Sequence, residues 1–303
     1  MISKNQVKYV HQLELKKFRK QEGLFIAEGH KVVGDLLAAG FFPKQLFATK
    51  EWLNENIPLL SKTLLHTIPL LSRRSQGWYD QAQVCSEQTI EVTEEELARL
   101  SLQQHPQQVL ALFPIPDTSG VHTSDSSGVH TSDSSGAFAM HPQNNKGICN
   151  APSPSLFLLL DNIQDPGNLG TIIRIADWFG IDTIYCSTGT VDAWNPKVVQ
   201  ATMGSIARVH IIYTDPLELL DQLPQDFPVY GTFLDGENIY TQELSANGLI
   251  VMGNEGNGIS DAVRARISRR LLIPDFHRGD TADSLNVAIA TAITCSEFRR
   301  RGL

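Results

Sequence analysis

Three turn-rich segments hold the side chains of this sequence that are best suited to chemistry. They read DNIQDPGNLGTIIR at 161–174, GNEGNGIS at 253–260 and PDFHRGDTADSLN at 274–286. Each follows an apolar run that is typical of a buried strand. Because ligands of parallel sheets bind at the carboxyl ends of the strands, we expect the three segments to contribute to one site.

The first segment turns into a helical pattern. Asn168 or Thr171 is suited to cap that helix, and Gly167 or Gly170 allows left-handed backbone or the close approach of a ligand. A helical side chain leans toward the N-terminus of its helix, so Arg174 is expected to reach back over the loop. Two interpretations of Arg174 stay open: a surface ion pair with the acid three residues later, or a bidentate grip on a phosphate.

The other two segments carry further polar side chains. GNEGNGIS has three glycines where a plain turn needs one or two, which indicates that its backbone comes very close to something. Glu255 is then solvated, a capping partner or a contact to a ligand. Ser284 is a natural helix N-cap and Asn286 falls in the first turn, so capping explains the serine but not the asparagine.

The spacing of residues in this sequence does not match the motifs of three other enzyme classes. The sequence DPGNLG lacks the G-x-G-x-x-G pattern, and the next strand ends without the acid that a dinucleotide-binding fold uses to hold a ribose. A Gly-Lys-Ser/Thr tripeptide, which a phosphate-binding P-loop needs, does not occur, and neither does the G-x-S-x-G pattern of serine hydrolases.

The elements that must position these loops lie in 156–303. Apolar runs separated by helical segments predict an α/β domain with a mostly parallel sheet that is covered on both faces. A final helix is expected over roughly 284–301. The predicted strands are LFLLLDN, IDTIYC, ARVHIIYT, PVYGTFL, GLIVMG and RRLLIP.

Strand and helix patterns also alternate in 1–112, with strand-like runs in GLFIAEG at 23–29 and KQLFAT at 44–49, which predicts a smaller α/β domain. It begins with one basic helix over 3–20. Between the two domains, 113–155 contains the perfect duplication GVHTSDSS GVHTSDSS. That segment cannot bury enough apolar surface to offset its ordering entropy, so we expect a disordered linker or insert.

Composition sets limits on the class of protein. Hydrophobic residues make up 42% of the 303 residues and charged residues 19%, which is typical of a globular protein. The net charge of −8 weakly opposes wholesale wrapping in nucleic acid but allows a local basic face. The four cysteines are far apart and show no metal-ligand spacing, so we expect no metal. The sequence shows no apolar signal core or membrane span, and we expect a soluble, cytoplasmic protein.

Taken together, the three segments resemble the motifs of the SpoU/TrmH family, a branch of the SPOUT superfamily of RNA 2'-O-ribose methyltransferases. The third motif departs from the family pattern by a longer loop and by Asp275, where the family usually has Met. The match also includes a connecting Met-Gly-Ser at 203–205. The matching residues are Asn162, Asp165, Asn168, Gly170 and Arg174 in the first motif, Gly253, Glu255, Gly256 and Gly258 in the second, and Ile273, Pro274, Ser284, Leu285, Asn286 and Val287 in the third.

The resemblance implies a fold and partners. It implies a SPOUT domain threaded as a deep trefoil knot, a homodimer with the cofactor site near the subunit interface, and S-adenosylmethionine as methyl donor. The stretch RKQEGLFIAEGHKVVGDLL is similar to the entry of the family's N-terminal substrate-binding domain, which has a ribosomal-protein-like fold. The resemblance also assigns Gly253, Asn254, Gly256, Ile273, Ser284 and Leu285 to the cofactor.

The resemblance further implies catalytic roles for Arg174, Asn168, Glu255, Ser284 and Asn286. A free guanidinium keeps its proton at neutral pH, so two mechanisms stay open. Either Arg174 loses its proton to a substrate phosphate, or it only positions that phosphate and the hydroxyl proton goes to solvent or Glu255.

Basic residues are candidate RNA contacts. Besides Arg174, they include three lysines of the N-terminal basic helix, four arginines before the third motif, and the arginine tail. They are Lys16, Lys17 and Lys20, then Arg264, Arg266, Arg269 and Arg270, and finally Arg299, Arg300 and Arg301.

The separate N-terminal domain favours rRNA as the substrate, because family members that act on tRNA often lack it. A tRNA 2'-O-methyltransferase is the alternative enzyme. A non-catalytic RNA-binding relative is the alternative class.

Overall fold

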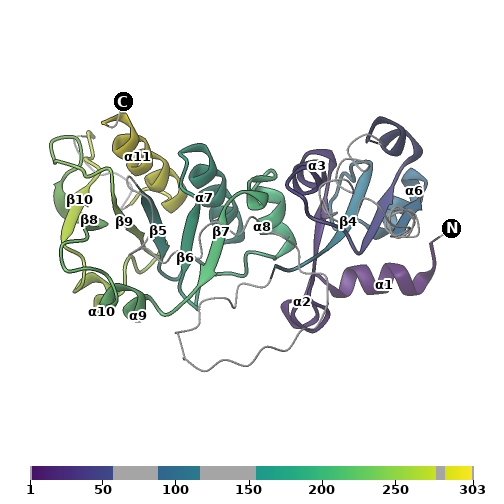
Figure 1. The fold of residues 1–303 in the computed structure, drawn as a ribbon, viewed down its shortest axis with the longest axis horizontal. Coiled ribbons are helices and arrows are strands. Elements are labelled where there is room, and N and C mark those ends of the chain that lie inside the picture. The colour runs from purple at the N-terminus through teal and green to yellow at the C-terminus, as the bar shows by residue number, and fades with distance from the viewer. Residues whose placement is uncertain (1, 57–87, 117–154, 278–283, 302–303) are drawn as a thin grey trace, which may run out of the picture. The chain divides into compact units, whose positions relative to one another are not determined.

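The chain divides into two compact units, 1–145 and 146–303. The predicted low-complexity segment 113–155 lies almost wholly outside the part of the chain that is described. The computed structural model describes residues 2–56, 88–116, 155–277 and 284–301 (Figure 1).

The first unit is a small α/β domain around a mixed sheet with strand order β1-β4-β2-β3. Strand β4 lies between β1 and β2 and is antiparallel to both, while β2 and β3 are parallel. The sequence patterns predicted β1 and β2 but not β4, the strand that joins them. The elements are α1 (Lys4–Gln12), α2 (Lys16–Glu22), β1 (Leu24–Glu28), α3 (His30–Ala38), β2 (Gln45–Ala48), β3 (Thr89–Glu91), α6 (Glu94–Leu100) and β4 (Val109–Pro114).

The prediction of one basic helix over 3–20 is wrong, because the chain breaks between α1 and α2. Leu13 is fully buried at this break. The guanidinium of Arg19, itself 1% exposed, donates hydrogen bonds to the carbonyls of Leu13 at 2.9 Å and Glu14 at 2.6 Å. These carbonyls are left without helical partners by the break, so Arg19 stabilises the corner rather than facing solvent.

The second unit contains all six strands that the apolar runs predict, and its final helix. The elements are β5 (Leu156–Leu160), α7 (Pro166–Trp178), β6 (Thr183–Cys186), α8 (Pro196–Ala201), β7 (His210–Tyr213), α9 (Pro216–Asp221), β8 (Val229–Asn238), β9 (Gly248–Met252), α10 (Asp261–Arg264), β10 (Arg269–Leu272) and α11 (Val287–Arg300).

These six strands form one sheet with the order β10-β8-β9-β5-β6-β7. Every pairing in it is parallel, which confirms the predicted parallel sheet. Strand β5 is in the middle and is buried along its whole length, as expected for a strand that is covered on both faces. The trefoil knot that the resemblance implies stays a prediction.

Helices cover the sheet on both sides (Figure 1). Alternate strand residues such as Phe157 and Leu159 pack with Leu220 of α9 and Val263 of α10. Helices α7 and α11 contact each other on the other side, where Phe298 of α11 packs edge-on against Tyr230 of β8.

Gly167 and Gly170 do not have the left-handed backbone that was one of the two expectations for them, and the close approach of a ligand to Gly167 stays a prediction. Neither is among the glycines with positive φ. A Cβ on Gly170 would lie 2.5 Å from the Cβ of Ala201 and 2.7 Å from the carbonyl oxygen of Val198. Gly170 therefore allows α7 to pack closely on α8.

Candidate active site

The predicted loops gather at the carboxyl edge of the parallel sheet. The first loop (161–168) follows β5, and the second loop (253–260) follows β9, the strand beside β5. The third loop (273–286, described except for 278–283) follows β10 and leads into α11. Because parallel strands all end at this edge, segments far apart in the sequence meet there.

Asn168 is the meeting point of all three loops. Its Nδ2 donates a hydrogen bond to Oε1 of Glu255 at 2.8 Å. Its Oδ1 accepts a hydrogen bond from Nδ2 of Asn286 at 2.9 Å. The structure thus brings three of the predicted catalytic side chains into one continuous chain of hydrogen bonds that ends on a carboxylate.

Helix α7 is capped differently from the prediction, which named Asn168 or Thr171. The N-cap is Asp165, whose Oδ1 accepts a hydrogen bond from the backbone N–H of Asn168 at 2.7 Å. Pro166 occupies the first turn, where its missing N–H costs nothing. Asp165 takes over the capping, and this frees the side chain of Asn168 to cross to the second loop.

The cap of α11 also differs from the prediction. Asn286, not Ser284, is the N-cap, and its Oδ1 accepts hydrogen bonds from the N–H groups of Ala288 at 3.0 Å and Ile289 at 3.3 Å. Capping therefore does explain the asparagine. Unlike a serine, it has an amide nitrogen left over, and this nitrogen reaches Asn168.

The glycines of the second loop are required for different structural reasons. A Cβ on Gly253 would lie 2.3 Å from the backbone of Gly258, where the loop folds back on itself. Gly258 has a left-handed φ of +68°. Neither glycine therefore needs a ligand to explain it. Gly256 is different, because a Cβ there would meet only Oδ1 of Asn254, at 3.6 Å.

A pocket of about 670 Å³ opens beside the second loop. Its walls combine glycine backbone with the apolar side chains of Met252, Leu272 and Val287. It also contains Glu255. The six residues that the resemblance assigned to the cofactor all line it, namely Gly253, Asn254, Gly256, Ile273, Ser284 and Leu285.

Arg174 does not join this group. It is exposed on α7, forms no hydrogen bond or ion pair with any residue that the structure describes, and does not line the pocket. The surface-pair interpretation is also wrong, because Asp177 pairs with Arg208 at 2.7 Å. Arg174 is thus an uncommitted guanidinium on the helix that carries Asn168.

One wall of the pocket was missed by sequence reasoning. Phe233 and Asp235 of β8 line it together with Arg264 of α10. The guanidinium groups of Arg264 and Arg270 lie 4.9 and 4.5 Å from the centre of the Phe233 ring, and both pair with Asp235. The signal was present: PVYGTFL was predicted as a strand, and Asp235 follows directly at its carboxyl end.

These ion pairs affect the titration of Asp235. Desolvation would raise its pKa, but the hydrogen bond from Arg270 and the charges of Arg270 and Arg264 together hold the pKa below its ordinary value. The carboxylate is therefore charged at neutral pH and balances one of the two guanidinium groups.

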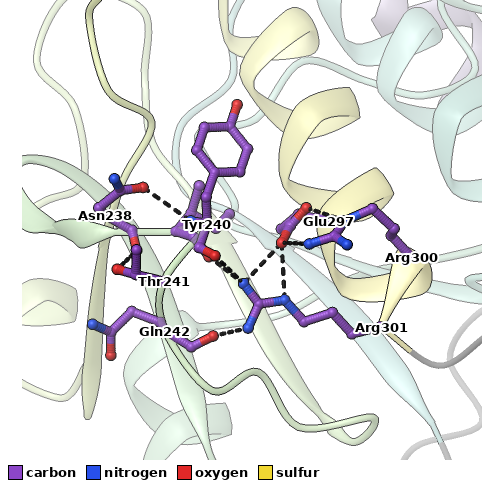
Figure 2. A network of polar contacts seen from close by, with 8 residues as sticks. Asn238, Tyr240, Thr241, Gln242, Glu297, Arg300 and Arg301 are labelled. Carbon is purple, nitrogen blue, oxygen red and sulfur yellow. Dashed lines mark hydrogen bonds and ion pairs between the residues drawn. The ribbon is translucent and has the colours of Figure 1, made fainter.

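Most of the arginines proposed as RNA contacts already have partners. Arg266 pairs with Asp221, and Arg299 donates to the carbonyls of Phe179 and Gly180 at the end of α7. Figure 2 shows Arg300 and Arg301 around Glu297, with Arg301 also donating to the carbonyls of Tyr240 and Gln242. The tail thus fastens the loop after β8 to α11. In contrast, Lys16, Lys17 and Lys20 are exposed.

The described residues hold no cluster of three or more His, Cys, Asp or Glu side chains that suits a metal ion. Among the same residues, no helix is both long enough and apolar enough to span a membrane.

Comparison with known proteins agrees with this geometry. A model of the SpoU rRNA Methylase family matches residues 155–296, and a model of the MRM3-like substrate binding domain matches residues 4–111. A solved structure described as a putative RNA methyltransferase of the TrmH family from Porphyromonas gingivalis is 35% identical, covers 99% of both chains and superposes with a TM-score of 0.70. The chain belongs to the SpoU/TrmH family.

Other family members carry functional names. The AdoMet-bound rRNA methyltransferase from Sinorhizobium meliloti is 26% identical over 100% of this chain and 97% of its own, with a TM-score of 0.71. The 23S rRNA (guanosine(2553)-2'-O)-methyltransferase RlmP of Bacillus subtilis is 36% identical over 52% of this chain and 65% of its own length. Human mitochondrial rRNA methyltransferase 3 is 29% identical over 76% of this chain and 44% of its own length. The matched stretch therefore spans less than two thirds of these two curated relatives.

Proposed function

We propose that this protein transfers a methyl group from S-adenosylmethionine to a ribose 2'-hydroxyl of rRNA. The observation that carries the proposal is the hydrogen-bonded chain Asn286–Asn168–Glu255, which ends on a carboxylate that lines a glycine-lined pocket. Supporting it are the SpoU/TrmH membership, the rRNA substrates named for several relatives, and the MRM3-like substrate binding domain at 4–111.

The pocket has the chemistry that the donor requires. The absence of internal packing at Gly256 leaves backbone open to the pocket, and Ile273 and Leu285 supply apolar walls. S-adenosylmethionine supplies a methyl group on a positively charged sulfur, which is already activated for transfer. Glu255 lines the same pocket and adds a carboxylate of the complementary charge.

The residues around the acceptor have two tasks, positioning and proton removal. Asn168 and Asn286 fix each other and Glu255, so the three groups are held before RNA arrives. Arg174, six residues after Asn168 on α7, has its full set of donors free among the described residues and suits an RNA phosphate. We therefore assign phosphate positioning to Arg174 and leave the proton to Glu255 or solvent.

We also propose that the protein acts as a homodimer. Leu285 and Ile289, at the start of α11 beside the pocket, are each 51% exposed although both are large and apolar. A second copy that covers this turn of α11 would remove that surface from water. Light scattering with size-exclusion chromatography on the protein, and on Ile289→Glu, tests this proposal: the protein is expected to be a dimer, and the variant a monomer.

The test of function is donor binding followed by methyl mapping. Calorimetry with S-adenosylmethionine is expected to give one site per chain. Labelled donor is then incubated with rRNA and with tRNA from a strain that lacks the gene, and 2'-O-methyl positions are mapped. Label in rRNA alone supports the proposal, whereas label in tRNA alone identifies tRNA as the substrate instead. If the protein binds no donor at millimolar concentration, the alternative of a non-catalytic RNA-binding protein is favoured.

A further inference from the structure

The first two loops are tied together by a buried carboxylate that none of the motif assignments uses. Asp161 follows β5 directly and is 2% exposed. Its Oδ2 accepts a hydrogen bond from the backbone N–H of Ser260, at the end of the second loop, at 2.8 Å. Its Oδ1 accepts a hydrogen bond from Nδ2 of Asn162, in the first loop, at 3.0 Å.

Asn162 extends the same connection. Its φ of +59° turns the backbone so that its carbonyl accepts a hydrogen bond from Nδ2 of Asn254 at 2.7 Å. Its own N–H donates to Oγ of Ser187 at 2.8 Å, in the loop after β6. A Cβ on Gly189 would lie only 1.9 Å from Oδ1 of Asn162, so that loop packs directly on this side chain.

The second loop needs such support from outside. It contains three glycines and is exposed from Glu255 to Gly258, so side-chain packing contributes little to its position. Asn254 organises its interior by accepting hydrogen bonds from the N–H groups of Gly256 and Asn257. The hydrogen bonds from Asn254 to Asn162 and from Ser260 to Asp161 then hold the two ends of the loop to the first loop.

We propose that Asp161 is a positioning residue that fixes the pocket-lining second loop relative to the acceptor side of the site. Its connection to donor binding rests on the proposed function, whereas its effect on the loop does not. Removing the carboxylate takes the acceptor away from the partly buried N–H of Ser260, and the hydrogen bond between the two loops is lost. The loop then opens more often and presents Gly253 and Gly256 to the donor in the required geometry less often.

Two variants remove the same hydrogen bond from opposite sides. Asp161→Leu removes both acceptor oxygens at nearly constant size. Ser260→Pro removes the donor N–H together with a hydroxyl that makes no capping hydrogen bond, and the φ of −60° at Ser260 is the value that proline imposes. Ile184→Val is the matched control, because it removes a buried methyl group from the neighbouring strand β6, where Ile184 pairs with Leu158 and Ile211 of the adjoining strands.

Amide hydrogen exchange of 253–260 in the free protein is the first readout, and it requires no activity. Both variants are expected to exchange there about tenfold faster, and to raise the Kd and KM for S-adenosylmethionine by about tenfold with the KM for RNA nearly unchanged. The double variant is expected to resemble Asp161→Leu, because Ser260→Pro removes a hydrogen bond that Asp161→Leu has already removed. The control is expected to leave exchange at 253–260 unchanged.

Exchange within twofold of the unmodified protein in the two variants overturns the assignment, even if the protein methylates RNA. So does an equal acceleration in Ile184→Val. If Asp161→Leu does not fold, Ser260→Pro decides by the same criterion. If the unmodified protein binds no donor, the proposed function fails alone, and exchange at 253–260 still decides the role of Asp161.

Discussion

At the scale of single residues, the site depends on asparagines that do two things at once. The backbone N–H of Asn168 donates a hydrogen bond to the cap residue Asp165, while its side chain forms hydrogen bonds with Glu255 and Asn286. The sequence predicted that these residues belong to one site. It did not predict which of several Asp, Asn, Ser and Thr residues caps each helix, because all of them cap well and only tertiary contacts select among them.

Arg174 is the first residue to test. Arg174→Lys keeps the charge but loses the planar pair of donors, and Arg174→Ala loses both. With a positioning role we expect kcat/KM for methyl transfer to fall about tenfold in the first variant and about a thousandfold in the second, with donor affinity unchanged. Steady-state kinetics and calorimetry measure these values.

Arg208→Lys is the matched control, because its arginine lies on the surface and pairs with Asp177. Near-normal methylation by both Arg174 variants would remove the arginine from the mechanism.

Alanine substitutions at two glycines of the second loop are expected to have different effects on stability. Gly253→Ala places a Cβ 2.3 Å from backbone and is expected to lower the free energy of unfolding by about 2 kcal/mol or more. Gly256→Ala has room and is expected to change it by less than about 0.5 kcal/mol. The second variant is still expected to weaken donor binding, because Gly256 lines the pocket.

Urea unfolding and calorimetry on both glycine variants separate these effects. A Gly256→Ala protein with unchanged stability and unchanged donor affinity would show that Gly256 is not part of the donor site.

At the scale of elements, the second unit was more predictable than the first. Strands β5, β9 and β6 are buried almost throughout, so they gave apolar runs that are distinct from the helices between them. The break between α1 and α2 could not be predicted from the sequence, because Leu13–Leu15 contains neither proline nor glycine. Only the burial of Leu13 and Arg19 produces the break. Strand β4 was not predicted, because its apolar run was its only signal. That run lies at the boundary between the first domain and the segment that was assigned to the linker.

Helix α2 is the element that is predicted to meet RNA. Lys16, Lys17 and Lys20 are exposed, whereas Arg19 of the same helix is buried and committed to the corner. Replacing the three lysines by glutamine is expected to reduce the slope of log Kd for RNA against log salt by about 2 to 3, which corresponds to three lost phosphate contacts. Filter binding across a salt series measures the slope.

The same replacement at Lys31 and Lys50, exposed lysines elsewhere in the first unit, is the control. An equal slope in the triple variant and the unmodified protein would exclude α2 from the RNA interface.

At the scale of the whole molecule, the arginine tail gives stability a dependence on pH. Glu297 is 5% exposed, and the hydrogen bond from Arg300, followed by that from Arg301, lowers its pKa from 4.5 to about 2 against the opposing effect of burial. A carboxyl whose pKa is lowered by folding stabilises the folded state above its unfolded pKa. This contribution is therefore complete above about pH 4.5 and disappears as the pH falls toward 2.

Glu297→Gln is expected to be less stable than the unmodified protein at pH 7, with the difference shrinking between pH 4.5 and 2. Urea unfolding at a series of pH values measures it. Asp177→Asn, which removes an exposed ion pair, is the control and is expected to change stability by less than about 1 kcal/mol. A difference for Glu297→Gln that does not vary with pH would contradict the ion-pair explanation.

The capping role of Asn286 has one more consequence. The same side chain begins α11 and completes the polar chain through Asn168, so the first turn of that helix and the readiness of the site share one equilibrium. Any ligand that holds the Asn286 amide also holds the helix start. A ligand that binds there is therefore expected to slow amide hydrogen exchange in the first turn of α11, which Asn286 caps.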